Sequence, residues 1–235
     1  YTSLAYNHLD SKDVNSIEAE ITGDAFDFNQ VSGNANDAVL SASKYGDKHR
    51  FIGVASKKFT YANDKWSTTL STFFEYAQGG RFSYTYAGNI NNDSSGQNND
   101  LLYVPTAGEL QQMQFSGTPA EQATQAANYE AYIQQDDYLS EKRGDYTDRY
   151  GALAPWRGKW DVKLLQDYKF STGDGKTNTI QISVDVLNVG NLLNSDWGIV
   201  QRPNNVSPVS VSVDQSTNTL TYSFNESNQE TYGYN

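Results

Sequence analysis

Apolar and polar residues alternate most clearly between Lys159 and Asn188, in two segments that follow each other directly. Alternation with a period of two places successive side chains on opposite faces of a β-strand. The apolar positions are Trp160, Val162, Leu164, Tyr168 and Phe170, and then Ile180, Ile182, Val184 and Val186. Gly173-Asp174-Gly175, between the segments, supplies residues that tolerate positive φ. The pattern predicts a hairpin with one apolar and one polar face.

The ends of these strands favour one kind of antiparallel sheet over another. Aromatic residues lie at the extremes of the apolar face, at Trp160 and at Tyr168 and Phe170, with aliphatic residues between them. Ten residues that rise roughly 3.3 Å each and tilt by about 40° span about 25 Å, the height of the lipid-facing band of a transmembrane barrel. The strands of a soluble β-sandwich also alternate apolar and polar residues. The aromatic residues at the strand ends therefore favour a transmembrane barrel. Gln166 falls on the apolar face, and the sequence offers no reason for it.

The opposite face of the hairpin is charged and faces a wet lumen in a barrel. Its charged residues are Asp161, Lys163, Asp167, Lys169 and Asp185. They could line a substrate path or form cross-strand charge pairs within the barrel wall. We favour charge pairs for most of them.

Three further strands are predicted before this hairpin, at Tyr1–Leu9, Lys48–Tyr61 and Lys65–Gln78. Connections on one side of the resulting sheet are short, at residues 62–64 and 172–176. Those on the other side are long, at residues 10–47, at 87–156 and after 188. Short periplasmic turns and long outer loops are typical of bacterial outer-membrane barrels.

The long connections contain some structure of their own. Thr118-Pro119-Ala120-Glu121 is a capping box with proline at the first helical position, and it predicts a helix from Pro119 to about Gln135. A shorter helix is expected within Gly108–Phe115, an extended piece within Ile17–Asp27, and a hairpin over Val206–Phe224. The excursion 87–156 is therefore expected to be a long, partly helical extracellular loop.

Five strands cannot close a barrel, since about eight is the smallest number that does. An open edge in lipid leaves unpaired backbone groups, each costing several kcal/mol. We therefore expect residues 1–235 to be a C-terminal portion of a larger barrel, without its final strand. The remaining strands are expected before Tyr1 and after Asn235.

Composition excludes several classes of function. The 235 residues carry a net charge of −11 and no cysteine, and only two histidines, His8 and His49. This charge argues against a nucleic-acid partner, and the lack of cysteine excludes disulfides and thiolate metal sites. A mean hydropathy of −0.69 excludes membrane-spanning helices. Aromatic residues make up 13%, which is high for so polar a chain.

Three segments resemble TonB-dependent outer-membrane receptors of the Oar-like type from Bacteroidota. They are NNDLLYVP (98–105), YLSEKRGDYTDRYGALAPWRGKWD (138–161) and QISVDVLNVGNLLNSDWG (181–198). The resemblance implies an all-β barrel of about 22 strands with an N-terminal plug. It also implies ligand uptake across the bacterial outer membrane, driven by the TonB machinery. This chain lacks a plug and a TonB-contacting segment, so transport belongs to a longer parent chain.

Two sets of residues are candidate binding sites. Asn89, Asn91, Asp93, Asn98 and Asp100 are rich in the oxygen ligands that Ca²⁺ takes, although such residues also simply form turns. Five loop tyrosines could bind a ligand at the extracellular opening of the barrel, or could pack the loop on itself. They are Tyr129, Tyr132, Tyr138, Tyr146 and Tyr150.

Two other motifs carry weaker expectations. Arg143-Gly144-Asp145 is formally an integrin-binding tripeptide, but a local structural role is the better interpretation. The carboxylate pairs Asp136/Asp137 and Asp145/Asp148 could serve acid–base chemistry on a glycoside. No other catalytic feature surrounds them, so we expect no enzyme.

Three functions remain open. The first is a transporter segment that contacts outer-membrane lipid, the rest of its own barrel and, through its parent chain, the TonB machinery. The second is a secreted all-β lectin or adhesin whose aromatic residues stack on sugars. The third is a non-transporting barrel subunit that binds a surface lipoprotein or other outer-membrane subunits.

Overall fold

A computed structural model describes residues 1–16, 20–93, 95, 97–224 and 232–234. The chain is mostly β and its principal sheet is antiparallel, as the alternation predicted. Within the described residues, no helix has the length and apolar character that a membrane crossing requires.

The principal sheet has five strands in the order β1-β4-β5-β11-β12. They are β1 (Thr2–His8), β4 (His49–Tyr61), β5 (Trp66–Ala77), β11 (Arg157–Ser171) and β12 (Thr177–Val186). These are the five predicted strands, and their outer bounds differ from the predicted ones by at most two residues. Neighbouring strands of this sheet follow one another along the chain. Short elements of other parts of the fold lie between β1 and β4 and between β5 and β11.

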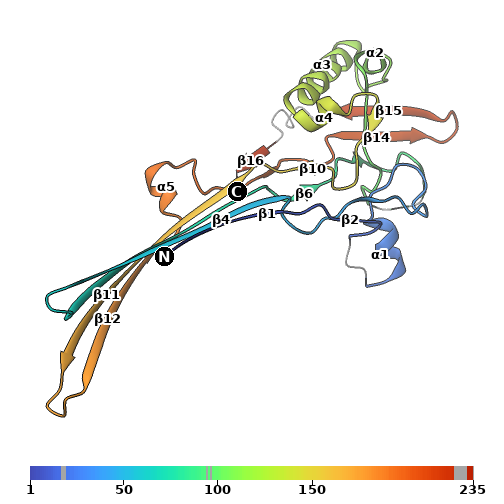
Figure 1. Cartoon of the computed structure of the whole chain (residues 1–235). Coiled ribbons are helices and arrows are strands. Elements are labelled where there is room, and N and C mark those ends of the chain that lie inside the picture. Colours follow the sequence, from blue (N-terminus) through green and yellow to red (C-terminus); the bar gives the residue numbers. More distant parts are fainter. Residues whose placement is uncertain (17–19, 94, 96, 225–231, 235) are drawn as a thin grey trace.

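Two tight turns close the sheet at one end (Figure 1). Between β4 and β5, Ala62, Asn63 and Asp64 all have left-handed φ, at 55°, 54° and 62°. Between β11 and β12, Gly175 has φ 76° and its N–H donates to the backbone oxygen of Thr172 at 2.9 Å. All long connections leave from the opposite end, which confirms the predicted asymmetry.

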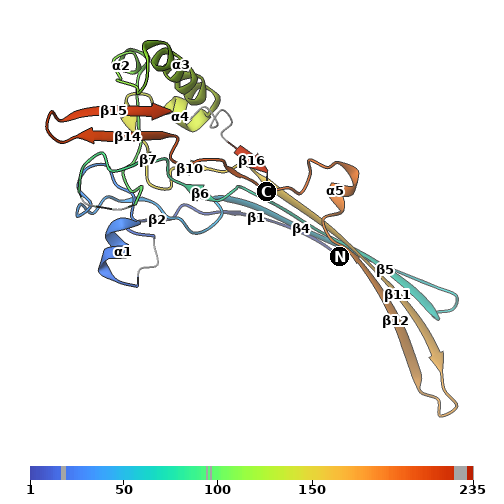
Figure 2. The ribbon, with the colours of Figure 1, turned by 180° about the vertical axis from the view of Figure 1, so that it is seen from behind.

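The long connections fold together into a body beyond that opposite end, which we call the loop body (Figures 1 and 2). Its helices are α1 (Thr22–Asp27), α2 (Ala107–Leu110), α3 (Pro119–Gln135) and α4 (Asp137–Glu141). Its short strands are β2 (Lys12–Asp13), β3 (Ser41–Ala42), β6 (Arg81–Phe82), β7 (Tyr86–Ala87), β8 (Tyr103–Val104), β9 (Asp145–Tyr146), β10 (Ala152–Leu153), β13 (Gln201–Pro203), β14 (Val209–Asp214), β15 (Thr219–Phe224) and β16 (Tyr232–Tyr234).

The molecule's hydrophobic core lies in this loop body and not beneath the sheet. Helix α3 buries Tyr129, Tyr132 and Ile133, and the ring of Tyr129 stacks on Phe224 with centroids 5.4 Å apart. Val209 of β14 is also fully buried in this core. The predicted hairpin near the end of the chain is therefore part of the excursion's core, a long-range contact that the periodicity did not indicate.

Several local predictions are confirmed and two are wrong. Helix α3 has the predicted bounds, and Thr118 and Glu121 form the predicted capping box. The shorter helix is α2, which begins at Ala107 and ends at Leu110. The extended piece expected within Ile17–Asp27 is wrong, because residues 22–27 form α1; residues 17–19 lie outside the described part. The loop expected after Asn188 instead contains helix α5 (Val189–Leu193).

Candidate functional site: a two-faced sheet and its loop body

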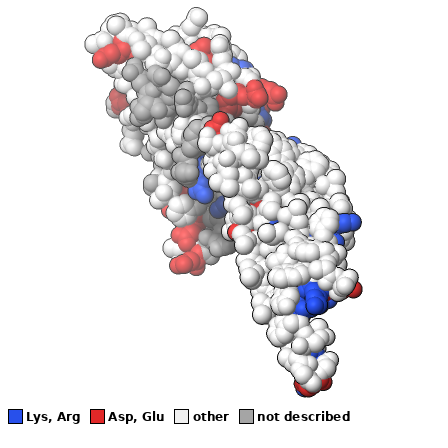
Figure 3. Space-filling model, turned by 90° about the vertical axis from the view of Figure 1, so that its left-hand side faces the viewer, with Lys and Arg blue, Asp and Glu red and all other residues white. Residues whose placement is uncertain are grey.

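One face of the principal sheet is apolar and exposed. The register aligns Leu70, Leu164 and Val184 across three neighbouring strands, and side chains of this band range from 42% exposure at Leu164 to 64% at Ile182. Figure 3 shows a mostly uncharged surface over the long strands, while acidic atoms gather over the loop body and at the far tip. Contiguous exposed apolar surface of this kind marks a contact with lipid or protein.

Aromatic side chains border this apolar face at both ends. Near the tight turns, the rings of Trp66 and Tyr168 lie 4.5 Å apart, centroid to centroid. Near the loop body, Tyr6 lies 4.7 Å from Phe51 and Tyr76 lies 4.9 Å from Trp156. Trp66 and Tyr76 are ten residues apart on β5, which corresponds to about 33 Å along an extended strand.

The structure explains Gln166, the polar residue on the apolar face. Its Oε1 accepts from Thr68 Oγ1 at 2.7 Å and from Tyr61 Oη at 3.3 Å, and its Nε2 donates to the backbone oxygen of Ser67 at 3.1 Å. Both ends of the amide therefore have partners, which lowers the cost of placing it among apolar side chains. Lys57 also lies on this face, opposite Leu70, and its long stem allows the ammonium to reach the surface of an apolar layer.

The other face of the sheet is polar and charge-paired. Lys163 Nζ lies 3.0 Å from Asp185 Oδ1, and Lys58 Nζ lies 3.6 Å from Asp167 Oδ2. Asp167 also accepts from Ser67 at 3.0 Å and from Gln181 at 2.7 Å. The expected cross-strand charge pairs are confirmed for these residues. Asp161 instead pairs with Lys159 of its own strand, at 3.0 Å.

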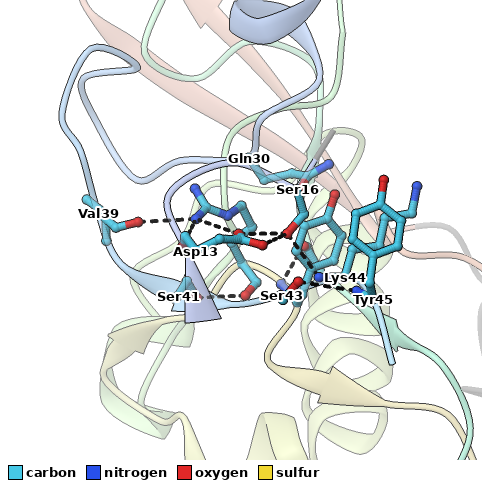
Figure 4. Close-up of polar contacts among 11 residues, drawn as sticks. Asp13, Ser16, Gln30, Val39, Ser41, Ser43, Lys44 and Tyr45 are labelled. Carbon is cyan, nitrogen blue, oxygen red and sulfur yellow. Dashed lines mark hydrogen bonds and ion pairs between the residues drawn. The ribbon is translucent and has the colours of Figure 1, made fainter. Parts of the chain in front are cut away.

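A buried arginine joins residues 10–47, the first long loop, to the excursion; Figure 4 shows Asp13, Val39 and Ser41 of that loop around it. Arg149 is only 3% exposed. Its Nη2 donates to the backbone oxygens of Asp13 and Val39, at 2.8 and 3.1 Å. Its own backbone oxygen accepts from Ser41 Oγ at 2.7 Å. Residues 10–47 and the excursion, which are far apart in sequence, are therefore connected through Arg149.

The five candidate tyrosines lie in different environments. Tyr129 and Tyr132 are buried in the core of the loop body, so packing accounts for them. Tyr150 is 7% exposed, and Tyr138 donates to Asp148 Oδ2 at 3.4 Å. Tyr146 is the most exposed, at 45%, and of the five it has the ring most open to a ligand.

The oxygen-rich segment 89–100 uses most of its candidate ligands in turn hydrogen bonds. Asn89 and Asn91 both accept from the backbone N–H of Asp93, at 3.2 and 3.1 Å, and Asn98 accepts from Gly88 at 3.0 Å. Asp100 is buried, and desolvation raises the pKa of its carboxyl. Its Oδ1 accepts no hydrogen bond from the described residues.

Calcium binding at this segment stays a prediction. The described residues contain no group of three or more His, Asp or Glu side chains arranged to hold a metal ion. Asp100 Oδ1 is the one candidate ligand atom of the five residues that is both buried and unpartnered within the described residues.

The remaining motifs have structural partners. Arg143 forms a two-pronged pair with Glu130, at 2.6 and 2.9 Å, and Gly144 takes φ 81°. Asp136 is buried and accepts from Tyr84 Oη at 2.8 Å, and burial raises the pKa of Tyr84. Asp148 lies 2.8 Å from Lys142 Nζ.

The sequence did not indicate a cleft of about 430 Å³ at the junction of the long loops. Gln30 and Lys44 of residues 10–47 line this cleft together with Arg81 of β6 and Tyr150 of the excursion. Ser207 lines it from the C-terminal segment. The cleft combines two cationic side chains with aromatic and hydroxyl groups. The one sequence feature that pointed toward this cleft is that Tyr150 lies in the segment 138–161, which carries the family resemblance.

No family model matches the chain, and neither a curated protein nor a solved structure matches it. The sheet and the loop body are therefore the features of the molecule that bear on its function.

Proposed function

We propose that this chain is part of the β-barrel of an outer-membrane receptor of the TonB-dependent type, which captures a ligand and imports it. The observation that carries the proposal is the apolar sheet face bordered by two aromatic belts, with a charge-paired face behind it. A lipid-facing barrel wall has this arrangement, since its outer band is apolar, its interfaces are aromatic and its lumen is polar.

The edges of the sheet support a larger assembly. Among the described residues, β1 pairs only with β4, and β12 pairs only with β11. In lipid, each unpaired N–H or C=O along such an edge costs several kcal/mol, so spanning sheets close on themselves. Further strands of the parent barrel then pair with β1 and β12.

The loop body supplies the capture surface in this proposal. It lies at the end of the sheet from which the long connections leave, which corresponds to the outer side of a bacterial barrel. Its cleft between three loops places Lys44 and Arg81 beside aromatic and hydroxyl groups. In this proposal, the TonB machinery supplies the energy for import and acts through the plug of the parent chain.

Two lysine substitutions at neighbouring positions of β11 test the proposal. Leu164 lies on the apolar face and Leu165 on the polar face. In a barrel wall, Leu164→Lys is expected to destabilise folding into phospholipid vesicles by about 2–4 kcal/mol. Leu165→Lys faces the lumen and is expected to cost much less. The measurement is the urea midpoint of each variant of the parent barrel, folded in vesicles.

Equal effects of the two substitutions would contradict the barrel. So would extraction of the native protein as a monomer without detergent. Either result would move the secreted lectin or adhesin to first place, because its apolar face would then be buried against protein.

A further inference from the structure

The segment after β12 lies beside the apolar face of the sheet, because Trp197 and Ile199 line one groove with Phe74, Tyr76 and Trp160. Asn188 begins it in the left-handed conformation, at φ 53°, and its backbone N–H donates to Asp161 Oδ1 at 2.8 Å. Helix α5 follows and projects from the sheet below the loop body (Figures 1 and 2). We call residues 187–200 the α5 segment.

Asparagine side chains hold the α5 segment in one conformation. Asn191 Nδ2 donates to the backbone oxygens of Ser195 and Trp197, at 2.9 and 3.0 Å, and Asn188 Nδ2 donates to Gly198 O at 3.2 Å. Trp197 packs over Gly190, where a Cβ would lie 3.7 Å from its side chain. The backbone's polar groups are thus partly satisfied within the segment.

The same segment turns its large apolar side chains outward. Leu192 is 75% exposed and Leu193 is 68% exposed. Leu187, Trp197 and Val200 are also exposed. A compact, internally hydrogen-bonded segment that presents so many apolar side chains is suited to a surface that is itself apolar.

A groove of about 470 Å³ connects the α5 segment to the sheet. Phe74, Tyr76 and Trp160 line it from the sheet, Trp156 from the residue just before β11, and Trp197 from the α5 segment. Three of the chain's four tryptophans therefore meet here. The outward surface of the α5 segment is continuous, through this groove, with the aromatic belt nearer the loop body.

We propose that the α5 segment inserts into the outer leaflet of the membrane and anchors the barrel wall at the interfacial level. This inference rests on the proposed function, because it takes the apolar face as the lipid-facing one. Tryptophan rings at the border of the apolar band favour the headgroup level, where one edge is apolar and the other wet. Asp196 limits the depth, since a carboxylate is costly in hydrocarbon.

Lipid fits this surface better than a protein partner does. Trp197 lies on the same side of the sheet as the apolar band, because apolar-face residues wall the groove that it lines. Leu192 and Leu193 of the same segment are exposed. A leucine-rich surface that continues a lipid-facing band meets acyl chains without any further assembly.

Spin labels at three positions test the inference, and the chain offers clean sites because it has no cysteine. Leu192→Cys reports the α5 segment, Leu164→Cys the apolar face, and Thr179→Cys the polar face. The protein is reconstituted in phosphatidylcholine vesicles, and collision rates with oxygen and with a water-soluble nickel complex are measured by electron paramagnetic resonance.

Labels at Leu192 and Leu164 are both expected to collide several-fold more with oxygen, relative to the nickel complex, than the label at Thr179. A label at Leu192 that favours nickel while Leu164 favours oxygen would overturn the anchor and leave the barrel standing. A label at Leu192 screened from both reagents would overturn it too, because protein would then cover the segment. If Leu164 favoured nickel, the proposed function itself would fail.

Discussion

The guanidinium of Arg149 donates from Nη2 to the backbone oxygen of Asp13, at 2.8 Å and across 136 positions of sequence. The same nitrogen also donates to the backbone oxygen of Val39, at 3.1 Å. Desolvation lowers the pKa of this guanidinium, and the nearby Asp13 carboxylate, 3.9 Å away, offsets part of that shift. Arginine remains charged in proteins, so this contact connects residues 10–47 to the excursion at any ordinary pH.

Arg149→Met is expected to detach residues 10–47 from the rest of the loop body. The substitution keeps much of the volume but leaves the carbonyls of Asp13 and Val39 without this donor, at a cost of about 1–3 kcal/mol. Hydrogen exchange of peptides covering residues 20–44 should accelerate, while exchange in β4 and β5 should not change. Arg202→Met, at an exposed arginine, is the matched control. Unchanged exchange in residues 20–44 would contradict the role of Arg149.

Glu130 is expected to make the loop body sensitive to acid. Hydrogen bonds from Arg143 hold the pKa of Glu130 below its usual value of 4.5. Because the folded-state pKa is lowered, the stabilisation is present above pH 4.5 and is lost as the pH falls through the folded pKa. Unfolding of the loop body, followed by circular dichroism at 222 nm, should therefore begin at low pH.

Glu130→Gln is expected to remove part of this acid dependence and to lower stability at neutral pH. Glu141→Gln, at an exposed glutamate of α4, is the control and should keep the wild-type profile. A Glu130→Gln variant with the wild-type acid transition would show that other carboxylates carry the effect.

Elements defined by local rules could be predicted from the sequence. The strands of the principal sheet follow from alternation, and α3 follows from Thr118, Pro119 and Glu121, all within one turn. The tight turn at Gly173-Asp174-Gly175 follows from the conformations that glycine tolerates. Each of these signals involves residues close together in the chain.

The features that could not be predicted from the sequence depend on contacts between residues far apart in the chain. Nothing in the sequence near Arg149 distinguishes it from a solvated arginine, because its partners lie more than one hundred positions earlier. The core contact between Tyr129 and Phe224 has the same character. Helix α5 was missed because five residues are too few for a helical period, and the side chains of Asn188 and Asn191 hold its segment in place.

Thr118 is expected to stabilise α3 through its cap. Its Oγ1 accepts from the backbone N–H of Glu121, and Glu121 Oε2 accepts from the backbone N–H of Thr118 at 2.7 Å. Thr118→Ala removes the first of these bonds and should cost about 1 kcal/mol. Thr118→Ser keeps an acceptor and should stay close to the wild type. The measurement is the thermal midpoint of the helical signal, and equal midpoints for the alanine and serine variants would contradict the cap.

Gln166 is expected to be coupled energetically to Thr68 across the strand pair. Thr68 Oγ1 donates to Gln166 Oε1 at 2.7 Å on the apolar face, where water is scarce if lipid covers the sheet. A double-mutant cycle of Thr68→Val and Gln166→Met, folded in vesicles, should give a coupling of about 0.6 kcal/mol, and no more than about 1.7. The same cycle with Gln181→Met, on the polar face, is the control and should give a coupling near zero, since separated sites add. Zero coupling in both cycles would mean that water or another strand satisfies Gln166, and the apolar face would then be wetter at this level than a lipid-facing wall allows.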